Sequence, residues 1–306
     1  MTVPPPAEDF ALLETEGRNP RTMDLDALST QQLVAKLHQE NQSVLLAVEA
    51  ALPSVTAVVD VLSEQLARGG RLFYVGAGTS GRLGVLDASE CPPTFGVSPD
   101  RVQGIIAGGN TALTTSIEGA EDSPESGAQV MRERSVGPKD VVIGIAASGR
   151  TPFVIGAMDV ARKSGAFTAA LVNVSNSAMS AHADITIAAV TGPEPVTGST
   201  RMKAGTAQKL VLNLLTTATM IRLGKVYSNL MVDVRATNRK LRDRAARIVM
   251  SAADVDRAEA DAALVAADGH VKTAIVMLRL NVDGAEAWRR LEASGGWVRN
   301  ALEMEG

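Results

Sequence analysis

The chain has 306 residues, and 45% of them are hydrophobic, which is enough to bury the core of one large α/β domain with a small addition. Its 30 Lys and Arg against 34 Asp and Glu give a net charge of −4, and only 3% of the residues are aromatic, so we expect no nucleic-acid partner. The single cysteine excludes an intrachain disulfide and a cysteine-rich metal site. The sequence has neither a basic leader nor an apolar segment near membrane-spanning length, so we expect a cytoplasmic protein without a membrane partner.

The N-terminal part is predicted to form an arm and two helices. Residues 1–24 are polar and rich in proline, which favours an extended arm. The run Ser29-Thr30-Gln31-Gln32 fits a capping box, in which serine and glutamine side chains satisfy the first N–H groups of a helix. We expect this helix to reach about Ala51, and we expect Pro53 to begin a second helix that ends near Gly69.

The middle of the chain alternates apolar runs with helical patterns, which is typical of βαβ units and a parallel sheet covered on both faces. The predicted strands are 71–76, 103–107, 140–146, 168–174 and 184–190, with helices at about 80–90, 111–120 and 152–164. A polar loop over 191–202 leads to a long helix at about 203–223 and to another at 231–251.

Residues 254–306 are rich in alanine and contain three helical patterns, 255–267, 270–280 and 284–304. We expect a small three-helix module that serves as a lid, an interface or a passive cap. The predicted fold is therefore α/β, a five-stranded parallel sheet flanked by helices, with this module at the C-terminal end. We divide the chain into 1–61 (arm and helices), 62–225 (sheet domain), 226–253 (connecting helix) and 254–306 (module).

Two strand-to-helix turns are rich in Gly, Ser and Thr: Gly76-Ala77-Gly78-Thr79-Ser80-Gly81-Arg82, and Ala146-Ala147-Ser148-Gly149-Arg150-Thr151-Pro152. Backbone N–H groups and hydroxyls at a helix N-terminus bind anions. We expect Gly78, Thr79, Ser80, Ser148, Gly149 and Thr151 to hold a phosphorylated small molecule. The alternative is that these glycines only make tight turns.

The first turn matches Gly-x-Gly-x-x-Gly, which alone would suggest a dinucleotide site. That site needs an acidic residue after the second strand, but the second strand here ends in Gly108-Gly109-Asn110. The hydroxyls of Thr79 and Ser80 favour a phosphate monoester instead. A third polar cluster precedes the long helix: Ser199 and Thr200 can cap the helix or contact a sugar, and Arg201 and Lys203 can offset ligand charge or remain solvated.

Carboxylates of unusual placement follow each of the first two strands. Glu90 stands just before Pro92-Pro93, so we expect its helix to end there, where the helix dipole disfavours an anion. Glu118 and Glu121 would share a helix face if that segment is helical. Each can also be an ordinary solvated carboxylate. Ser80 and Glu90 are ten residues apart, about 15 Å along a continuous helix. We therefore hypothesise a homodimer in which Glu90 serves the neighbour's site.

None of the three histidines, His38, His182 and His270, sits in a sequence motif with other potential metal ligands. We predict no metal site and no cofactor, and we expect packing or surface roles, with a place in a lid as the alternative for His270.

Five motifs, in this order, resemble the N-acetylmuramic acid 6-phosphate etherase family: Gly76-Ala77-Gly78-Thr79-Ser80-Gly81-Arg82, Leu86-Asp87-Ala88-Ser89-Glu90-Cys91-Pro92-Pro93-Thr94, Glu118-Gly119-Ala120-Glu121-Asp122, Ala146-Ala147-Ser148-Gly149-Arg150-Thr151-Pro152 and Thr197-Gly198-Ser199-Thr200-Arg201-Met202-Lys203-Ala204-Gly205-Thr206. The resemblance runs from Thr15 to the C-terminal module. It implies a sugar isomerase (SIS) domain over about 62–225. It also implies cleavage of the lactyl ether of N-acetylmuramic acid 6-phosphate, giving N-acetylglucosamine 6-phosphate and D-lactate in cell-wall recycling.

The resemblance implies that Glu90 is the proton donor and that Glu121 is also catalytic. Two carboxyl groups in opposite protonation states can remove the proton at C2 of the ring-opened sugar and assist the leaving lactyl oxygen without a metal. We assign Glu90 as acid and Glu121 as base, with the exchanged assignment left open. A non-catalytic hexose-phosphate sensor, such as the glucokinase regulator related to this family, and a ketose–aldose isomerase are the alternatives.

Overall fold

The computed structural model describes residues 14–234 and 239–304. Contacts divide the chain into two compact units. The sheet unit comprises the residues up to Ser89 and Asp100–Leu215, and the helical unit comprises Glu90–Pro99 and the residues from Thr216 onward. Part of the predicted N-terminal arm, residues 1–13, lies outside the described residues.

The sheet unit is built on five parallel strands in the order β2-β1-β3-β4-β5. Their bounds are β1 Leu72–Gly76, β2 Val102–Ile106, β3 Val141–Ala146, β4 Phe167–Val172 and β5 Ile185–Ala188. All five predicted strands are present within two residues of their predicted ends, and the α/β class is confirmed. The runs are apolar throughout because helices cover both faces, so every residue of β1 and β3 is buried.

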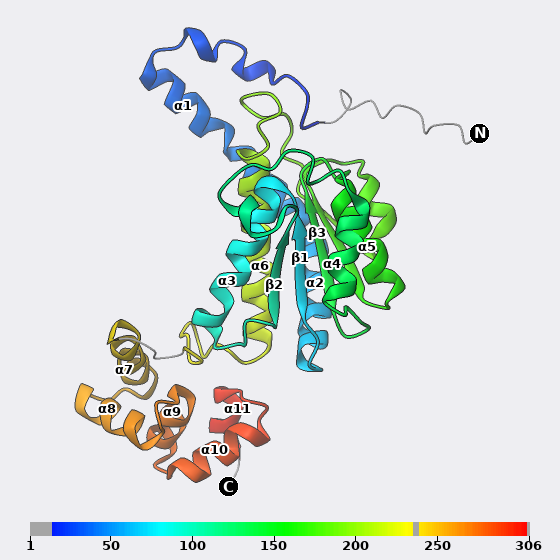
Figure 1. Cartoon of the computed structure of the whole chain (residues 1–306). Coiled ribbons are helices and arrows are strands. Elements are labelled where there is room, and N and C mark those ends of the chain that lie inside the picture. The colour runs from blue at the N-terminus through cyan, green and yellow to red at the C-terminus, as the bar shows by residue number, and fades with distance from the viewer. Residues whose placement is uncertain (1–13, 235–238, 305–306) are drawn as a thin grey trace. The chain divides into compact units, whose positions relative to one another are not determined.

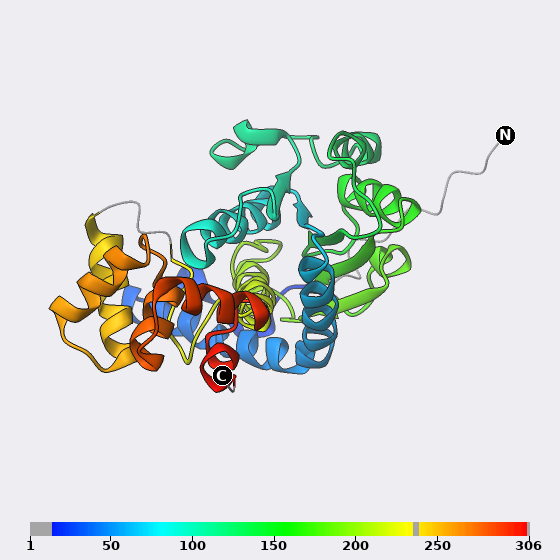
Figure 2. The same ribbon diagram turned by 90° about the horizontal axis from the view of Figure 1, so that it is seen from below.

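Two helical layers enclose the sheet (Figure 1). Helices α4 (Pro124–Glu133) and α5 (Pro152–Lys163) lie side by side in both views (Figures 1 and 2) and pack on one face, where Phe73 and Val142 join their core. Helices α2 (Gln42–Ala67), α3 (Gly78–Phe95) and α6 (Lys203–Arg222) lie on the other side. The sheet is therefore buried, and its polar residues gather beyond the strand ends.

The N-terminal segment differs from the prediction in its helix boundaries and in the structure of residues 14–24. The capping box of Ser29 and Gln32 is present and opens α1 (Thr30–Glu40), but the helix stops at Asn41. Pro53 lies inside α2 and begins no helix. The expected extended arm is also wrong for residues 14–24, which include the 3-10 turn η2 (Pro20–Thr22). A second 3-10 turn, η3 (Leu25–Ala27), follows before α1. Hydrogen bonds from Asn19 and Thr22 to the carbonyls of Pro193 and Pro195 hold this segment in place.

The helix predicted at 111–120 is wrong. Residues Gly109–Leu113 form only a 3-10 turn, η4, and Gly119 has φ +72° in the left-handed region, which interrupts any helix there. The helix begins later, at α4, where Ser123 is the N-cap and Pro124 takes the first position. Glu118 and Glu121 therefore lie on a loop and do not share a helix face.

The helix that carries Glu90 does not stop at Glu90 as predicted. It continues through Pro92 and Pro93 to Phe95, and the N–H of Gly96 still donates to the carbonyl of Pro92 at 3.0 Å. Cys91 and Phe95 are buried, and this burial offsets the two N–H donors that the prolines lack.

The helical unit contains α7 (Arg239–Ala253), α8 (Arg257–Ala266), α9 (Val271–Leu280), α10 (Gly284–Ala293) and α11 (Val298–Glu303). The helix predicted over 231–251 therefore starts later, and its positions 235–238 lie outside the described residues. The predicted helix 284–304 is two helices, because Gly295 and Gly296 adopt φ +63° and +81°. A short 3-10 turn, η5 (Ala178–His182), completes the elements of the sheet unit.

The expectation that no apolar segment reaches membrane-spanning length is wrong for one stretch. Within the described ranges, the helical residues Thr30–Ala67 include an 18-residue window of mean hydropathy 1.9, long and apolar enough by these two measures. Core helices meet the same test, and nine side chains of α2, including Val58 and Leu62, are buried.

Candidate active site

The first turn joins β1 to α3 with almost no space for side chains. A Cβ on Gly76 would lie 2.7 Å from the backbone nitrogen of Gly81, and a Cβ on Gly81 would lie 2.6 Å from a side-chain carbon of Ile106. Both positions must therefore be glycine for the helix to start so close to the strand. Gly78 is exposed and Ser80 is buried, with its Oγ 2.9 Å from Oε1 of Gln208.

The second turn joins β3 to α5 and is fixed from the side. Gly149 has φ +65°, and a Cβ there would lie 2.2 Å from Oγ of Ser177. The carbonyl of Gly149 accepts hydrogen bonds from the Ser177 hydroxyl at 3.0 Å and from the N–H of Met179 at 2.9 Å. Thr151 is the N-cap residue of α5, and Ser148 and Thr151 remain partly exposed.

The helix that follows the third polar cluster, α6, is capped by a residue that the sequence analysis did not identify. The carboxylate of Glu194, fully buried, accepts from the N–H groups of Lys203 and Ala204 at 2.9 Å each, so it caps α6. Burial raises the pKa of Glu194, while the two N–H groups act in the opposite direction. A carboxylate between two prolines ahead of a helix was the available signal. Ser199 and Thr200 are left partly exposed beside this cap.

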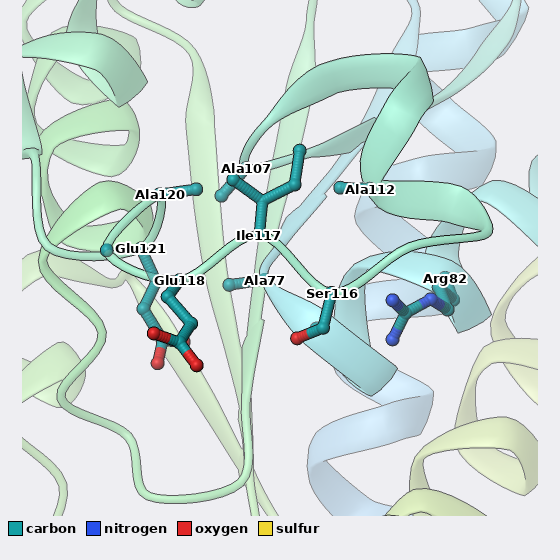
Figure 3. A pocket seen from close by; sticks show the side chains of 11 residues that line it. Ala77, Arg82, Ala107, Ala112, Ser116, Ile117, Glu118, Ala120 and Glu121 are labelled. Carbon is teal, nitrogen blue, oxygen red and sulfur yellow. The ribbon is translucent and has the colours of Figure 1, made fainter.

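A pocket of about 250 Å³ lies between the first turn and the loop that follows β2. It is lined by Ala77, Gly78, Arg82, Ala107, Ala112, Ser116, Ile117, Glu118, Gly119, Ala120 and Glu121. Figure 3 shows the carboxylates of Glu118 and Glu121 pointing to the same side, with Arg82 beyond Ser116. Two predicted carboxylates and one predicted turn residue, Gly78, are thus in one pocket.

Two hydrogen bonds position the walls of this pocket. The guanidinium of Arg82 donates to the carbonyl of Leu113 at 3.0 Å, which ties α3 to the loop. The carbonyl of Glu121 accepts from the N–H of Phe153 at 2.9 Å, two residues after Thr151. The carboxylate loop is therefore held to the start of α5, where the second turn ends. Glu90, by contrast, is exposed on α3 in the part assigned to the helical unit.

Lys203, predicted to offset ligand charge, is fully buried. Its Nζ lies 3.3 Å from Oε2 of Glu40, which also takes two hydrogen bonds from Arg21 at 2.6 and 2.8 Å and one from Asn19 at 2.6 Å. The ammonium of Lys203 is thus paired inside the protein, whereas Arg201 is exposed. The Arg21 guanidinium, with Asn19 and Lys203, lowers the pKa of Glu40 to about 2 against the cost of burial.

The helical unit has a separate charged cavity of about 410 Å³. Asp233 lies 2.7 Å from Nζ of Lys272 and 3.0 Å from Nζ of Lys225. His270 accompanies them, with its ring 5.2 Å from that of Trp288, and burial lowers its pKa. His182 pairs with Asp159 at 2.6 Å. Among residues 14–234 and 239–304, no group of three or more His, Cys, Asp or Glu side chains could hold a metal ion.

The chain is similar to proteins of known family along most of its length. It is 58% identical over 264 residues to N-acetylmuramic acid 6-phosphate etherase 2 of Vibrio cholerae, covering 86% of each chain. It is 53% identical over 268 residues to N-acetylmuramic acid 6-phosphate etherase of Mycolicibacterium smegmatis, covering 88% of this chain and 90% of that protein. The chain belongs to the N-acetylmuramic acid 6-phosphate etherase family.

Domain families agree with this etherase assignment at the level of the fold. Residues 54–162 match the glucokinase regulatory protein N-terminal SIS domain, and residues 119–218 match the SIS domain. A solved phosphoheptose isomerase from Neisseria gonorrhoeae is 17% identical, with a TM-score of 0.47, over 63% of this chain and 97% of that one.

Proposed function

We propose that the pocket beside the first turn is the catalytic centre of this etherase, with Glu121 as base and Glu90 as acid. As a family member, the chain is a carbon–oxygen lyase that acts in amino-sugar recycling. It converts N-acetylmuramic acid 6-phosphate into N-acetylglucosamine 6-phosphate and D-lactate. The observation that supports the location is that Gly78 and the carboxylates of Glu118 and Glu121 line one pocket.

The reaction needs a base and an acid in turn. After the sugar ring opens, the C2 proton is α to the C1 aldehyde, and Glu121 takes it. The C3–oxygen bond then breaks, and Glu90 protonates the departing lactate oxygen as the C2–C3 double bond forms. Water adds at C3 and a proton returns to C2, so the sum is hydrolysis of the ether. General acid–base catalysis of this kind contributes about 10²–10⁴-fold per group. Glu118 is the neighbouring carboxylate that can assist water.

We propose that the sugar phosphate lies at the strand ends. Gly78, Thr79 and Ser80 would meet it from the first turn, and Ser148, Gly149 and Thr151 from the second. Ser199, Thr200 and the exposed Arg201 would bind from the third cluster. Lys203 would act through Glu40 by fixing the start of α6. Parallel sheets bind ligands at this edge because helix N-termini converge there.

We propose a homodimer in which Glu90 completes the neighbour's site. The support is that α3 runs unbroken from Gly78 to Phe95, so Ser80 and Glu90 are separated by about 15 Å of helix rise. The test is to mix the inactive variants Glu90→Gln and Glu121→Gln after dissociation. A shared site predicts recovery of about a quarter of wild-type activity, because half of the dimers are mixed and each mixed dimer has one intact site. No recovery would place both carboxylates in one chain.

We infer a cytoplasmic location for this homodimer, since its product is a phosphorylated sugar and the chain has a single cysteine. The activity is tested by D-lactate release from N-acetylmuramic acid 6-phosphate. Tight hexose-phosphate binding without D-lactate would favour the sensor, and aldose–ketose exchange would favour the isomerase.

A further inference from the structure

Three buried polar side chains form a chain of hydrogen bonds behind the first turn. Nδ2 of Asn173 donates to the carbonyl of Ala189 at 2.8 Å, and Nε2 of Gln208 donates to Oδ1 of Asn173 at 2.9 Å. Oγ of Ser80 donates to Oε1 of Gln208 at 2.9 Å. The exposed fractions are 0% for Asn173, 1% for Gln208 and 8% for Ser80. Water therefore does not compete for the hydrogen bonds of Asn173 and Gln208.

We call this series of hydrogen bonds, from Ser80 through Gln208 and Asn173 to the carbonyl of Ala189, the relay. The donor and acceptor of every bond in it follow from the Ala189 carbonyl. A backbone carbonyl can only accept, so Asn173 must turn its NH₂ group to Ala189 and its oxygen to Gln208. Gln208 must then turn its NH₂ group to Asn173 and its oxygen to Ser80. The Ser80 hydroxyl has one hydrogen, and it donates this hydrogen to the side-chain oxygen of Gln208. The Ala189 carbonyl thus fixes the direction of a hydroxyl on a different element, at the start of α3.

The relay also fixes the position of the Ser80 oxygen. Asn173 follows β4, and its own N–H donates to the carbonyl of Ala147 at 3.1 Å, beside the second turn. Ala189 follows β5 directly, and Gln208 lies on α6. The ends of β4 and β5 and the helix α6 therefore hold one hydroxyl at the end of β1.

We propose that Gln208 and Asn173 are positioning residues that present Ser80 to the ligand as a hydrogen-bond acceptor. This rests on the proposed function, in which Ser80 contacts the sugar phosphate. Because the Ser80 hydroxyl donates its hydrogen bond to Gln208, its oxygen can only accept a hydrogen bond from the ligand. Its partner on the ligand is therefore a hydroxyl. That hydroxyl belongs either to the sugar or to a singly protonated phosphate, since a phosphate dianion has acceptors only.

A double-mutant cycle tests the positioning role. Gln208→Met keeps a similar volume and removes the acceptor, and we expect it to raise KM for N-acetylmuramic acid 6-phosphate about 10-fold with little change in kcat, as for one lost and unsatisfied hydrogen bond. In a Ser80→Ala background the same change should leave KM unaltered, because Gln208 acts through Ser80. An equal rise in both backgrounds would overturn the proposal. So would a lower KM in Gln208→Met, because Gln208 would then be competing with the ligand for the hydroxyl hydrogen.

Gln208→Glu keeps the test open if the methionine variant does not fold. A protonated carboxyl reproduces the relay, with one oxygen accepting from Ser80 and the O–H donating to Asn173. We expect its KM to be closest to wild type at acid pH, where the carboxyl is protonated and both hydrogen bonds of the relay can form. A KM that falls as the pH rises would overturn the proposal, because a carboxylate only accepts and Asn173 would then have to donate to residue 208. A KM at acid pH as high as that of Ser80→Ala would overturn it as well.

A phosphate monoester without sugar hydroxyls, ethyl phosphate, is used as an inhibitor to distinguish a phosphate hydroxyl from a sugar hydroxyl. If the partner is a phosphate hydroxyl, Ser80→Ala weakens inhibition by ethyl phosphate most below the second pKa of the monoester, about 6, where one phosphate oxygen is protonated. If the partner is a sugar hydroxyl, Ser80→Ala weakens binding of the sugar phosphate and leaves inhibition by ethyl phosphate unchanged. An unchanged KM in Ser80→Ala would refute the proposed contact between Ser80 and the sugar phosphate. Additive effects of Gln208→Met and Ser80→Ala on KM would refute only the positioning role of Gln208.

Discussion

The interiors of the two units hold polar groups in different ways. Behind the turns of the sheet unit, the relay from Ala189 to Ser80 consists of neutral amides and a hydroxyl. In the helical unit, Asp233 lies between the ammonium groups of Lys225 and Lys272. A neutral relay keeps its direction across the physiological pH range, because none of its members titrates there. A cluster of charges depends on each member, because removing one leaves the others uncompensated.

This difference accords with separate tasks. A site that removes a proton next to a carbonyl needs fixed donors and acceptors, and in the function proposed above the sheet unit supplies them from its strand ends. The charges of the helical unit join α9 to the segment around Asp233, so their effect is on the stability of that unit. Experiments on the first should change turnover and KM, and experiments on the second should change unfolding.

The largest effect is expected from the pocket carboxylate. Glu121→Gln should lower kcat about 10²–10⁴-fold while KM changes little, because the base acts on the C2 proton and not on the phosphate. The measurement is D-lactate release under saturating substrate. The matched control is Glu133→Gln on the exposed face of α4, which should keep wild-type turnover. Near-normal kcat in Glu121→Gln would remove this residue from the mechanism.

The next effect should come from the charge cluster of the helical unit. Asp233→Asn leaves the buried ammonium of Lys272 without its carboxylate and should destabilise this unit by about 3–5 kcal/mol. Both tryptophans, Trp288 and Trp297, lie in the helical unit, so denaturant unfolding followed by tryptophan fluorescence reports on it alone. Asp243→Asn, whose partners Arg247 and Arg257 are exposed, should destabilise the unit much less than Asp233→Asn does, because solvent screens exposed ion pairs. Equal losses would show that the Asp233 cluster has no special role.

A third effect is expected at acid pH in the sheet unit. The pKa of Glu40 is about 2 in the folded chain and near 4.5 when unfolded, so its carboxylate contributes stability that is full above about pH 5 and is lost as the pH falls toward 2. The loss should be about 2–3 kcal/mol, reduced by solvent around the exposed Arg21. Far-UV circular dichroism should show that Glu40→Gln lacks this part of the acid dependence, whereas Glu64→Gln on the surface of α2 retains it. Acid curves of the same slope in all three proteins would contradict the Glu40 account.

The smallest effect concerns His270. Burial lowers its pKa, so the folded state favours the neutral ring, and protonation in the unfolded chain favours unfolding. Stability of the helical unit should therefore fall as the pH decreases below about 6.5, the ordinary histidine value. Tryptophan-detected unfolding at pH 8 and pH 5.5 should show less of this fall in His270→Gln than in wild type. His38→Gln is the control, and a fall of the same size in His270→Gln would count against the neutral ring.

The sequence predicted the strands well because buried parallel strands are continuous apolar runs. It failed where tertiary contacts override local preference. Burial of Cys91 and Phe95 carries α3 through two prolines, and the left-handed Gly119 turns a predicted helix into the loop that holds Glu121. The two glycine turns could be predicted from the sequence because only glycine fits where their backbone lies so close to neighbouring atoms. Gln208 and Asn173 gave no local signal, because their partners lie 128 and 16 residues away in the chain.

Exchange at C2 in heavy water tests the central claim most directly. With N-acetylmuramic acid 6-phosphate in D₂O, the chain should release D-lactate and leave deuterium at C2 of the sugar product. Glu90→Gln, which keeps the base, should still exchange the C2 proton of unreacted substrate, while Glu121→Gln should not. Exchange at the wild-type rate in Glu121→Gln, or product without deuterium from the wild-type chain, would contradict the pocket of Glu121 as the place where the proton is removed.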